Sequence, residues 1–385
     1  ITQDERRDEG AVIFTAAIPG ASRAVLFAFA ESTWESHPLL VYDLIDDSLR
    51  WLQREPTIVR AAWPNGKVAA QVIEMDTEEG FANALAFAAM MQAIEYRATF
   101  YVLTSVGRRF PDVMQRLERD FEIGYHADVH DGFKGQSAKL QEQRMQIMRS
   151  ELALVMTDTK AVTGFRAPLE SYDATTEQLL HRVGIRHHTV DPGRSDARLP
   201  VVAKLVGVAP DDALIILPRT QRDDINLSRQ NLSVEQTTRN LIDDFDLAVD
   251  SGALGLLSVH SQNFQPESVL IKAMPGLIDR IKQRRNQVWL ASATQVADWW
   301  RERGHFKLSS VNTGKRLEFD ITVEGSKPLN GATLIIMLPQ KGVLPSIQSM
   351  KIGLPKPTVT ALDDYRAAVV FSSLKPGNYS YQATF

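Results

Sequence analysis

From Val68 onward, short apolar runs rich in β-branched and aromatic residues alternate with longer segments of helical period. This alternation is typical of a parallel sheet whose strands are joined by crossover helices. Eight strand and helix units predict a closed or nearly closed (β/α) barrel, distorted and with seven to eight parallel strands. The expected strands cover residues 68–74, 98–103, 121–125, 161–166, 185–190, 214–217, 254–259 and 288–291.

Two of the expected helices show the clearest amphipathic pattern. Apolar residues recur three and four positions apart in residues 80–95 and again in 137–157, which places them on one face of each helix. These faces predict packing against the sheet. Their apolar positions are Phe81, Ala84, Leu85, Ala88 and Met91 in the first, and Met145, Met148, Leu152 and Val155 in the second.

The flanks follow other patterns. Residues 1–62 contain one expected strand, 24–30, and one amphipathic helix, 39–52. Two elements cannot bury a core alone, so this α/β segment either packs on the barrel or is the tail of an upstream domain, which we favour. After Trp300 the pattern changes to period-two alternation with turn residues, which predicts a β-sandwich. We therefore expect three parts: 1–62, a barrel at 63–304 and a sandwich at 305–385.

Composition narrows the possible functions. The 385 residues are 44% hydrophobic and 23% charged, as in ordinary globular proteins. A net charge of -4 without blocks of like charge gives no electrostatic footprint for nucleic acid or an anionic membrane. The absence of cysteine excludes disulfides and thiol catalysis. The chain opens at Ile1 with neither an initiator methionine nor an apolar signal core, so we expect a cut within a longer protein, and its apolar runs are too short to span a bilayer.

Unusual polar residues fall at the ends of the expected strands. Asp76, Glu78 and Glu79 follow the first strand, and His126 and His130 follow the third. Two imidazoles four residues apart can converge on a divalent metal, most often zinc. The alternatives are helix N-terminal charge for the carboxylates, favoured by the helix dipole, and solvated loop histidines.

Arg166 follows the fourth strand and His260 the seventh. By itself, Arg166 is as easily interpreted as a surface ion pair, and His260 as a satisfied core histidine. However, the carboxyl ends of barrel strands form one rim, where barrel active sites are built. If each of these residues had an unrelated structural role, they would not all be expected to lie on the same rim. Their joint position therefore favours an active site.

The order and spacing of these residues resemble the polysaccharide deacetylase (NodB homology) family over most of residues 63–304. Residues 98–103 are similar to the family's second strand, and 121–126 with His130 resemble its paired-histidine metal motif. The resemblance implies a distorted (β/α) barrel and a metal-dependent hydrolase of a carbohydrate. The remaining matches are Asp76 at the position of the catalytic base, Arg166 and Pro168 in the third motif, Asp191 in the fourth, and residues 257–260 in the fifth.

The sequence departs from the family at two motifs. Where the family has a second Asp that ligates the metal, Asp76 is followed by Thr77. Glu78 or Glu79 would supply that carboxylate, and we choose Glu78, which with two imidazoles makes an acceptable Zn²⁺ set. The third motif has Ala167 and Leu169 in place of a proline and an aromatic residue. The Leu169 backbone N–H would still serve as an oxyanion donor, because that role needs no side chain.

The resemblance thus implies roles for the rim residues. His126, His130 and Glu78 would hold the metal, and Asp76 would take a proton from the attacking water. His260 would protonate the leaving amine, Arg166 would keep Asp76 ionised, and Asp191 would orient Arg166 or His260.

Two other functions stay open on the sequence. One is hydrolysis of another carbon–nitrogen amide, such as a ureide or cyclic imide, within the same superfamily. The other is non-catalytic glycan binding by a barrel that has lost its metal, which Thr77 would favour. The family resemblance also implies a polysaccharide substrate and a bacterial protein of the cell envelope, periplasmic or extracellular.

Overall fold

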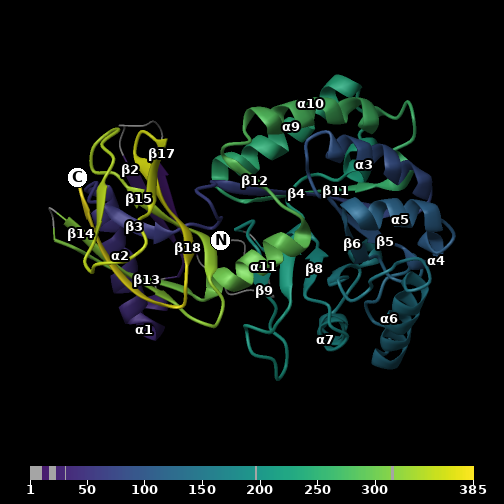
Figure 1. Ribbon diagram of the computed structural model, residues 1–385, viewed down its shortest axis with the longest axis horizontal. Helices are drawn as coiled ribbons and strands as arrows, with labels where there is room; N and C mark the ends of the chain where they lie inside the picture. Colours follow the sequence, from purple (N-terminus) through teal and green to yellow (C-terminus); the bar gives the residue numbers. More distant parts are fainter. Residues whose placement is uncertain (1–10, 17–22, 31, 196, 314–315) are drawn as a thin grey trace. The chain divides into compact units, whose positions relative to one another are not determined.

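The computed structural model describes residues 11–16, 23–30, 32–195, 197–313 and 316–385 (Figure 1). The chain divides into two compact units. One is Lys67–Gly304, and the other combines the described parts of Ile1–Gly66 with His305–Phe385. The first unit contains every residue that the sequence assigned to an active site.

The Lys67–Gly304 unit is a curled sheet of parallel strands with helices outside it. The strand order is β11-β4-β5-β6-β7-β8-β10-β9, and β12 pairs with β4. All ladders are parallel except β9 with β10. The strands are β4 (Ala69–Thr77), β5 (Thr99–Val102), β6 (Glu122–Tyr125), β7 (Gly164–Arg166), β8 (His187–Val190), β9 (Val201–Val202), β10 (Ile215–Pro218), β11 (Leu254–His260) and β12 (Val288–Leu290).

The barrel is closed by a loop rather than by a ladder. The residues that follow β10 bond to β11: Thr220 Oγ1 accepts from the N–H of Leu256 at 2.9 Å, and the N–H of Gln221 donates to the Leu256 carbonyl at 3.2 Å. The predicted distorted barrel is therefore confirmed. Each of the eight expected strands is present, and the short antiparallel β9 is an addition that the sequence pattern did not predict.

Helices and 3₁₀ turns cover the outside of this sheet (Figure 1). Helix α6 begins where Ser137 Oγ accepts from the N–H of Leu140, and it ends five residues before the predicted end at 157. The helices are α3 (Ala84–Gln92), α4 (Thr104–Gly107), α5 (Pro111–Asp120), α6 (Ala138–Leu152), α7 (Ala174–Arg182), α8 (Asp224–Ser228), α9 (Val234–Ser251), α10 (Val269–Gln283) and α11 (Ala293–Gly304), and the turns are η1 (Phe81–Asn83), η2 (Pro168–Glu170), η3 (Pro192–Arg194) and η4 (Ser261–Asn263).

The second unit is a sandwich of two four-stranded antiparallel sheets. Their orders are β13-β14-β19-β16 and β17-β18-β15-β3. Phe371 and Phe319, one from each sheet, both pack against the ring of Tyr381 and form part of the core. The strands are β3 (Thr57–Arg60), β13 (Phe306–Asn312), β14 (Arg316–Val323), β15 (Leu329–Met337), β16 (Ser346–Ser349), β17 (Thr358–Asp363), β18 (Arg366–Leu374) and β19 (Gly377–Thr384).

The N-terminal segment differs from its prediction. The expected strand and helix are present as β2 (Arg23–Ala28) and α2 (Pro38–Leu52), together with β1 (Ala11–Ala16), which pairs with β2, and a short α1 (Thr33–Ser36). The last strand, β3, pairs with β15 and completes a sheet of the sandwich. Residues 1–62 are therefore not separate from 305–385 as the three-part division had it. Four residues on a sheet edge carry too little periodicity to reveal such a partner.

Among the helices of the described residues, none combines the length and the apolar character needed to cross a bilayer.

Candidate active site

Strand register brings the polar side chains of the barrel together. In the β4–β11 ladder His260 lies beside Asp76, and Ser258 lies beside Glu74. Because side chains alternate between the faces of a strand, Glu74 and Asp76 share one face, and so do their two partners. The sequence thus places a carboxylate and an imidazole side by side at the carboxyl end of two neighbouring strands.

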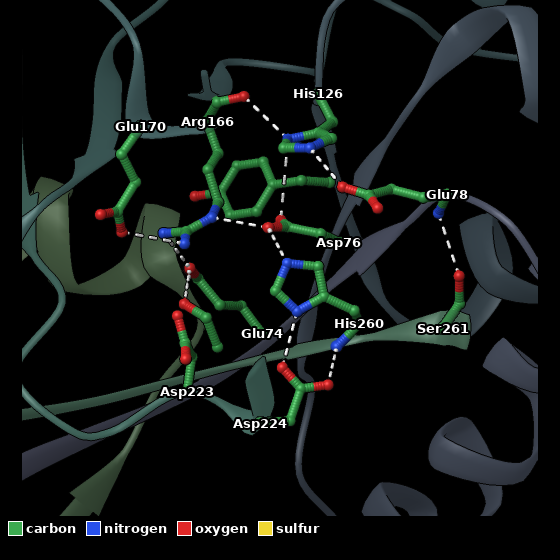
Figure 2. A network of polar contacts seen from close by, with 12 residues as sticks. Glu74, Asp76, Glu78, His126, Arg166, Glu170, Asp223, Asp224, His260 and Ser261 are labelled. Carbon is green, nitrogen blue, oxygen red and sulfur yellow. Dashed lines mark hydrogen bonds and ion pairs between the residues drawn. The ribbon is translucent and has the colours of Figure 1, made fainter. Parts of the chain in front are cut away.

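Arg166, at the end of β7, holds Asp76 in place (Figure 2). Its Nε donates to Asp76 Oδ2 at 2.7 Å, its Nη1 to Glu74 Oε1 at 3.1 Å, and its Nη2 to Glu170 Oε1 at 3.2 Å. Burial lowers the pKa of Arg166, but the charges of Asp76, Glu74 and Glu170 outweigh burial and raise it. The guanidinium therefore stays charged, and its Nε–H fixes the orientation of the Asp76 side chain.

Glu74 lies one layer deeper and is fully buried. Ser258 and Thr189 donate to its two oxygens, at 2.7 and 3.2 Å. Burial raises the pKa of Glu74 to about 7, against the opposing charge of Arg166. This interior carboxylate anchors Arg166 from below.

Glu78 lies between two histidines. Its Oε1 is 3.0 Å from His126 Nε2 and 2.8 Å from His130 Nε2. Burial raises the pKa of Glu78, but the hydrogen bonds to His126 and His130 outweigh burial and lower it. The bond to Glu78 raises the pKa of His130. These three residues offer ligand atoms that all lie within 4.8 Å of one another.

The hydrogen bonds of His126 test whether a cation fits there. His126 Nδ1 lies 3.0 Å from the carbonyl oxygen of Arg166, an acceptor, so Nδ1 carries a proton. In the neutral ring, Nε2 then has a lone pair, and this lone pair faces a carboxylate oxygen of Glu78. Two acceptors at that distance require a proton or a metal ion between them. A divalent metal therefore fits the donor set of Glu78, His126 and His130.

The carboxylate of Asp76 also has an oxygen that is available to a ligand. Its Oδ2 bonds to Arg166, whereas its buried Oδ1 has no hydrogen-bond partner among the described residues. Buried carboxylate oxygens are rarely left unpaired in native structures. The free oxygen lies 3.8 Å from His126 Nδ1, which places it beside the candidate metal ligands.

His260 is held by Asp224, at the start of α8 (Figure 2). The ring Nδ1 lies 2.6 Å from Asp224 Oδ1, and the backbone N–H of His260 donates to Oδ2 at 2.8 Å. Burial lowers the pKa of His260, but the bond to Asp224 and the charges of Asp224, Asp76 and Glu78 raise it to about 9. At neutral pH the ring is protonated, and its Nε2 lies 3.6 Å from Asp76 Oδ2.

Comparison with known proteins shows what this region resembles in sequence and in fold. Residues 64–188 match the model of the polysaccharide deacetylase family. This stretch of the chain resembles the polysaccharide deacetylases. The predicted family resemblance is thereby confirmed for residues 64–188.

Solved structures show the same fold at low sequence identity. A putative polysaccharide deacetylase from Mycobacterium smegmatis superposes with a TM-score of 0.53 at 17% identity, covering 64% of this chain and 94% of that one. A probable polysaccharide deacetylase from Pseudomonas aeruginosa PAO1 gives 0.53 at 15%, covering 64% and 95%. The Puue allantoinase gives 0.51 at 15%, covering 63% and 93%. None of the curated proteins matches the chain.

Within the Lys67–Gly304 unit, the structure brings together six of the predicted site residues: Asp76, Glu78, His126, His130, Arg166 and His260. Thr77, between the first two, is buried, and its Oγ1 donates to the carbonyl of Tyr101 at 3.0 Å. The side chain at this position is directed to β5. Because the Thr77 side chain is directed away from the histidines, the carboxylate that contacts His126 and His130 comes from the next residue, Glu78.

Asp191 does not make the contacts predicted for it. Its Oδ2 accepts from the hydroxyl of Tyr172 at 2.8 Å, and its Oδ1 accepts from the N–H of Gly193 at 3.0 Å. The orienting roles expected of Asp191 belong to Glu74 and Glu170 on Arg166, and to Asp224 on His260. The prediction chose the carboxylate after β8, while the one that reaches His260 follows β10.

The predicted oxyanion residues lie in η2, directly after Arg166. Pro168 is buried, whereas the side chain of Leu169 is exposed and its φ is 58°. A positive φ at a residue with a branched side chain is uncommon and marks a constrained turn. The oxyanion role of the Leu169 N–H stays a prediction.

Asp224, Glu74 and Gln262 are site residues that the sequence prediction missed. Gln262 Nε2 donates to Glu78 Oε2 at 2.7 Å and so fixes the oxygen that faces away from the histidines. One signal was available: Asp223 and Asp224 follow a buried apolar run, as the other rim residues do. Glu74 and Gln262 gave no comparable signal, because one lies within a strand and the other in a turn.

Proposed function

We propose that the Lys67–Gly304 unit is a metal-dependent hydrolase that removes N-acetyl or O-acetyl groups from a polysaccharide. One observation carries the proposal: a candidate metal set lies beside two oriented proton-transfer groups. Glu78, His126 and His130 form the set, and the groups are Asp76 on Arg166 and His260 on Asp224. Zinc is the proposed metal, because two imidazoles and one carboxylate are typical of catalytic zinc sites.

A metal ion bound by Glu78, His126 and His130 would supply the Lewis acidity that lowers the pKa of water and polarises the acyl oxygen. The protein's part is to orient those ligands. The Arg166 carbonyl fixes the tautomer of His126, and Gln262 fixes the rotamer of Glu78. Such outer contacts hold ligands in the geometry that the metal needs.

Asp76 is the proposed general base. Arg166 binds one oxygen of its carboxylate, and the other oxygen is free to accept a proton from the attacking water. Rotation of the carboxylate is blocked because Nε of Arg166 binds the other oxygen. The base is therefore already oriented before substrate arrives.

His260 is the proposed general acid. Its Nδ1–H donates a hydrogen bond to Asp224. Its Nε2–H is therefore directed toward Asp76. A pKa of about 9 keeps the ring protonated at neutral pH, which is the form needed to donate to a leaving amine. Proton uptake by Asp76 and proton release by His260 then occur at neighbouring positions in the β4–β11 ladder.

The substrate and the compartment rest on the family alone. The match of residues 64–188 supports the proposed polysaccharide substrate. A bacterial, periplasmic or extracellular location is proposed from the family resemblance alone. The similarity to an allantoinase concerns the fold, and no contact in the site favours a small ureide over an acylated sugar.

Acetate release from acetylated glucosamine oligomers by the zinc-loaded chain tests the proposal. Asp76→Asn and His260→Ala should each lower kcat by about 10²- to 10⁴-fold, the usual contribution of a general base or acid. Asp191→Asn, which changes a rim carboxylate outside these contacts, should cost less than about tenfold. Thermal melting of each variant reports whether the fold is kept. Folded Asp76→Asn and His260→Ala variants with wild-type rates would refute the acid and base assignments.

A further inference from the structure

Glu78 belongs to two groups of candidate metal ligands, and the proposed function uses only one of them. The first group is Glu78, His126 and His130. The second group is Asp76, Glu78 and His260, and its ligand atoms also all lie within 4.8 Å of one another. In Figure 2, Asp76 lies between the rings of His126 and His260, so the two groups are neighbours on the rim.

Asp76 has a free donor atom for the second group. Arg166 binds its Oδ2 at 2.7 Å, whereas its buried Oδ1 has no hydrogen-bond partner among the described residues. The residue is only 1% exposed. Because buried carboxylate oxygens are nearly always paired in native proteins, this oxygen indicates a ligand that brings positive charge or a proton.

The ring of His260 is held as the rings of metal-bound histidines are. Its Nδ1 donates to Asp224 Oδ1 at 2.6 Å, and Asn263 Nδ2 fixes Asp224 by donating to Oδ2 at 2.9 Å. A carboxylate on the second ring nitrogen is the usual partner of a histidine ligand. The coordinating nitrogen is then Nε2, and Asp76 Oδ2 lies 3.6 Å from it, beyond hydrogen-bond length.

The donor types select a class of ion. Calcium and magnesium prefer oxygen ligands throughout, whereas an imidazole nitrogen with two carboxylates favours zinc or a similar transition metal. Glu78 would be shared by the ions of the two groups, and Gln262 Nε2 holds its Oε2 at 2.7 Å. Carboxylates are suited to this because they have two oxygens.

We propose that Asp76, Glu78 and His260 form a second, weaker site for a divalent transition-metal ion such as zinc, and that an ion bound there inhibits hydrolysis. The inhibition rests on the proposed function, in which Asp76 accepts a proton and His260 donates one. The ion occupies both residues, and coordination releases the Nε2 proton to solvent because one lone pair cannot hold both. Its affinity is lower because a first ion of like charge is bound to the same glutamate.

The stoichiometry of zinc binding tests the second site independently of activity. The metal-free chain, without an affinity tag, is titrated calorimetrically with zinc chloride, and elemental analysis after dialysis against each zinc concentration counts the bound ions. His130→Ala removes a ligand of the first group alone, and His260→Ala removes a ligand of the second alone. His188→Leu removes a buried histidine outside both groups and is the matched control.

The wild type should bind one ion tightly and a second at least about tenfold more weakly. His260→Ala should keep the tight ion and lose the weak one, and His188→Leu should match the wild type. Thermal melting of each variant checks the fold. Saturation of the wild type at one ion overturns the second site, and so does a second ion that folded His260→Ala retains.

A milder variant keeps the test decisive if His260→Ala does not fold. Asp224→Asn leaves all three ligands in place and removes only the carboxylate that orients the ring of His260. The second ion should bind about 10- to 100-fold more weakly to this variant, the usual effect of losing such a partner. An unchanged affinity for the second ion would contradict the coordination by Nε2.

Acetate release at rising zinc concentration tests the inhibition. The wild-type rate on N-acetylglucosamine oligomers should reach a maximum as the first site fills and then fall by about 10²-fold or more as the second fills, because the base and the acid are both lost. A rate that stays at its maximum while the second ion binds overturns the inhibition. A chain that releases no acetate at any zinc concentration refutes the proposed function, whereas a second ion that depends on His260 still supports the site.

Discussion

Two sets of buried histidines in the barrel have opposite properties. At the rim, His260 lies against Asp224, and its pKa is raised to about 9. In β8, His188 packs between the rings of Phe165 and Tyr172, neither of its ring nitrogens has a partner among the described residues, and burial lowers its pKa. Burial alone therefore does not make a histidine a catalytic group. The difference is the carboxylate of Asp224, whose hydrogen bond raises the pKa of His260.

His187, the neighbour of His188, shows that a nearby carboxylate is not enough. Its Nε2 lies 3.7 Å from Glu122, yet burial lowers its pKa to about 3. The oxygens of Glu122 are occupied by Ser292, Thr294 and Thr99. The rim carboxylates are directed at imidazoles, whereas this interior carboxylate is directed at hydroxyl and backbone groups.

Removal of a rim histidine should have the largest effect. His126→Ala deletes a proposed metal ligand, and we expect loss of bound zinc and a fall in kcat/KM of about 10³-fold or more. His188→Leu removes an equally buried ring and should keep the wild-type zinc content. Elemental analysis of both purified variants measures this. Equal zinc content in His126→Ala and the wild type would mean that the ligand set is wrong.

A carboxylate placed where nothing binds it should destabilise the fold. Thr77→Asp restores the residue that the family resemblance implies, but the side chain here faces the carbonyl of Tyr101. We expect a loss of about 3 kcal/mol in the free energy of unfolding and no gain in activity. Urea denaturation measures the first, with Thr77→Val as a neutral control for the lost hydroxyl. A Thr77→Asp variant that is more active than the wild type would contradict the assignment of Glu78.

Neutralising the partner of His260 should change the pH dependence. The pKa of His260 is raised, so the protonated acid is present below about pH 9 and is lost as pH rises through that value. Asp224→Asn removes the main cause of the increase. We expect the alkaline limb of kcat to move to lower pH and kcat at pH 7 to fall by about 10- to 100-fold. A pH–rate profile measures both, and an unmoved limb would show that another group limits the rate.

The smallest effect is expected in β8. Because the pKa of His188 is lowered in the folded state, below pH 6.5 the unfolded state binds the additional proton, and stability decreases as pH falls. His188→Leu removes this proton uptake and a buried polar ring. We expect a gain of about 1 kcal/mol in the free energy of unfolding at pH 7 and a larger gain at pH 5. Urea denaturation at the two pH values measures it. Equal gains would mean that His188 does not titrate on unfolding.

The sequence predicts the parts of this molecule that depend on local pattern. The barrel strands were predictable because each is a buried apolar run between turn residues. Asp76, His126, Arg166 and His260 were predictable because each lies at the end of such a run, and parallel strands end at one rim. His130 was predictable from its spacing of four residues from His126. Here local sequence and global fold agree.

What the sequence does not predict are pairings set by register and side-chain direction. Glu74 was not expected as a partner of Arg166, because it lies inside an apolar strand and meets β7 across the barrel. Asp224 and Asp191 both follow buried strands, and the fold alone determines which reaches His260. The strand β3 was missed for a similar reason, since its partner β15 is distant in the chain.

The pairing of β3 with β15 has a consequence for how the protein is made. The sandwich is a discontinuous unit, because one strand precedes the entire Lys67–Gly304 unit and the other seven follow it. During synthesis the barrel can complete its core while Thr57–Arg60 still has no neighbour, since domains tend to fold as their residues emerge. The backbone groups of β3 find their partners only after β15 has left the ribosome, so the sandwich cannot close before the entire Lys67–Gly304 unit has been synthesised.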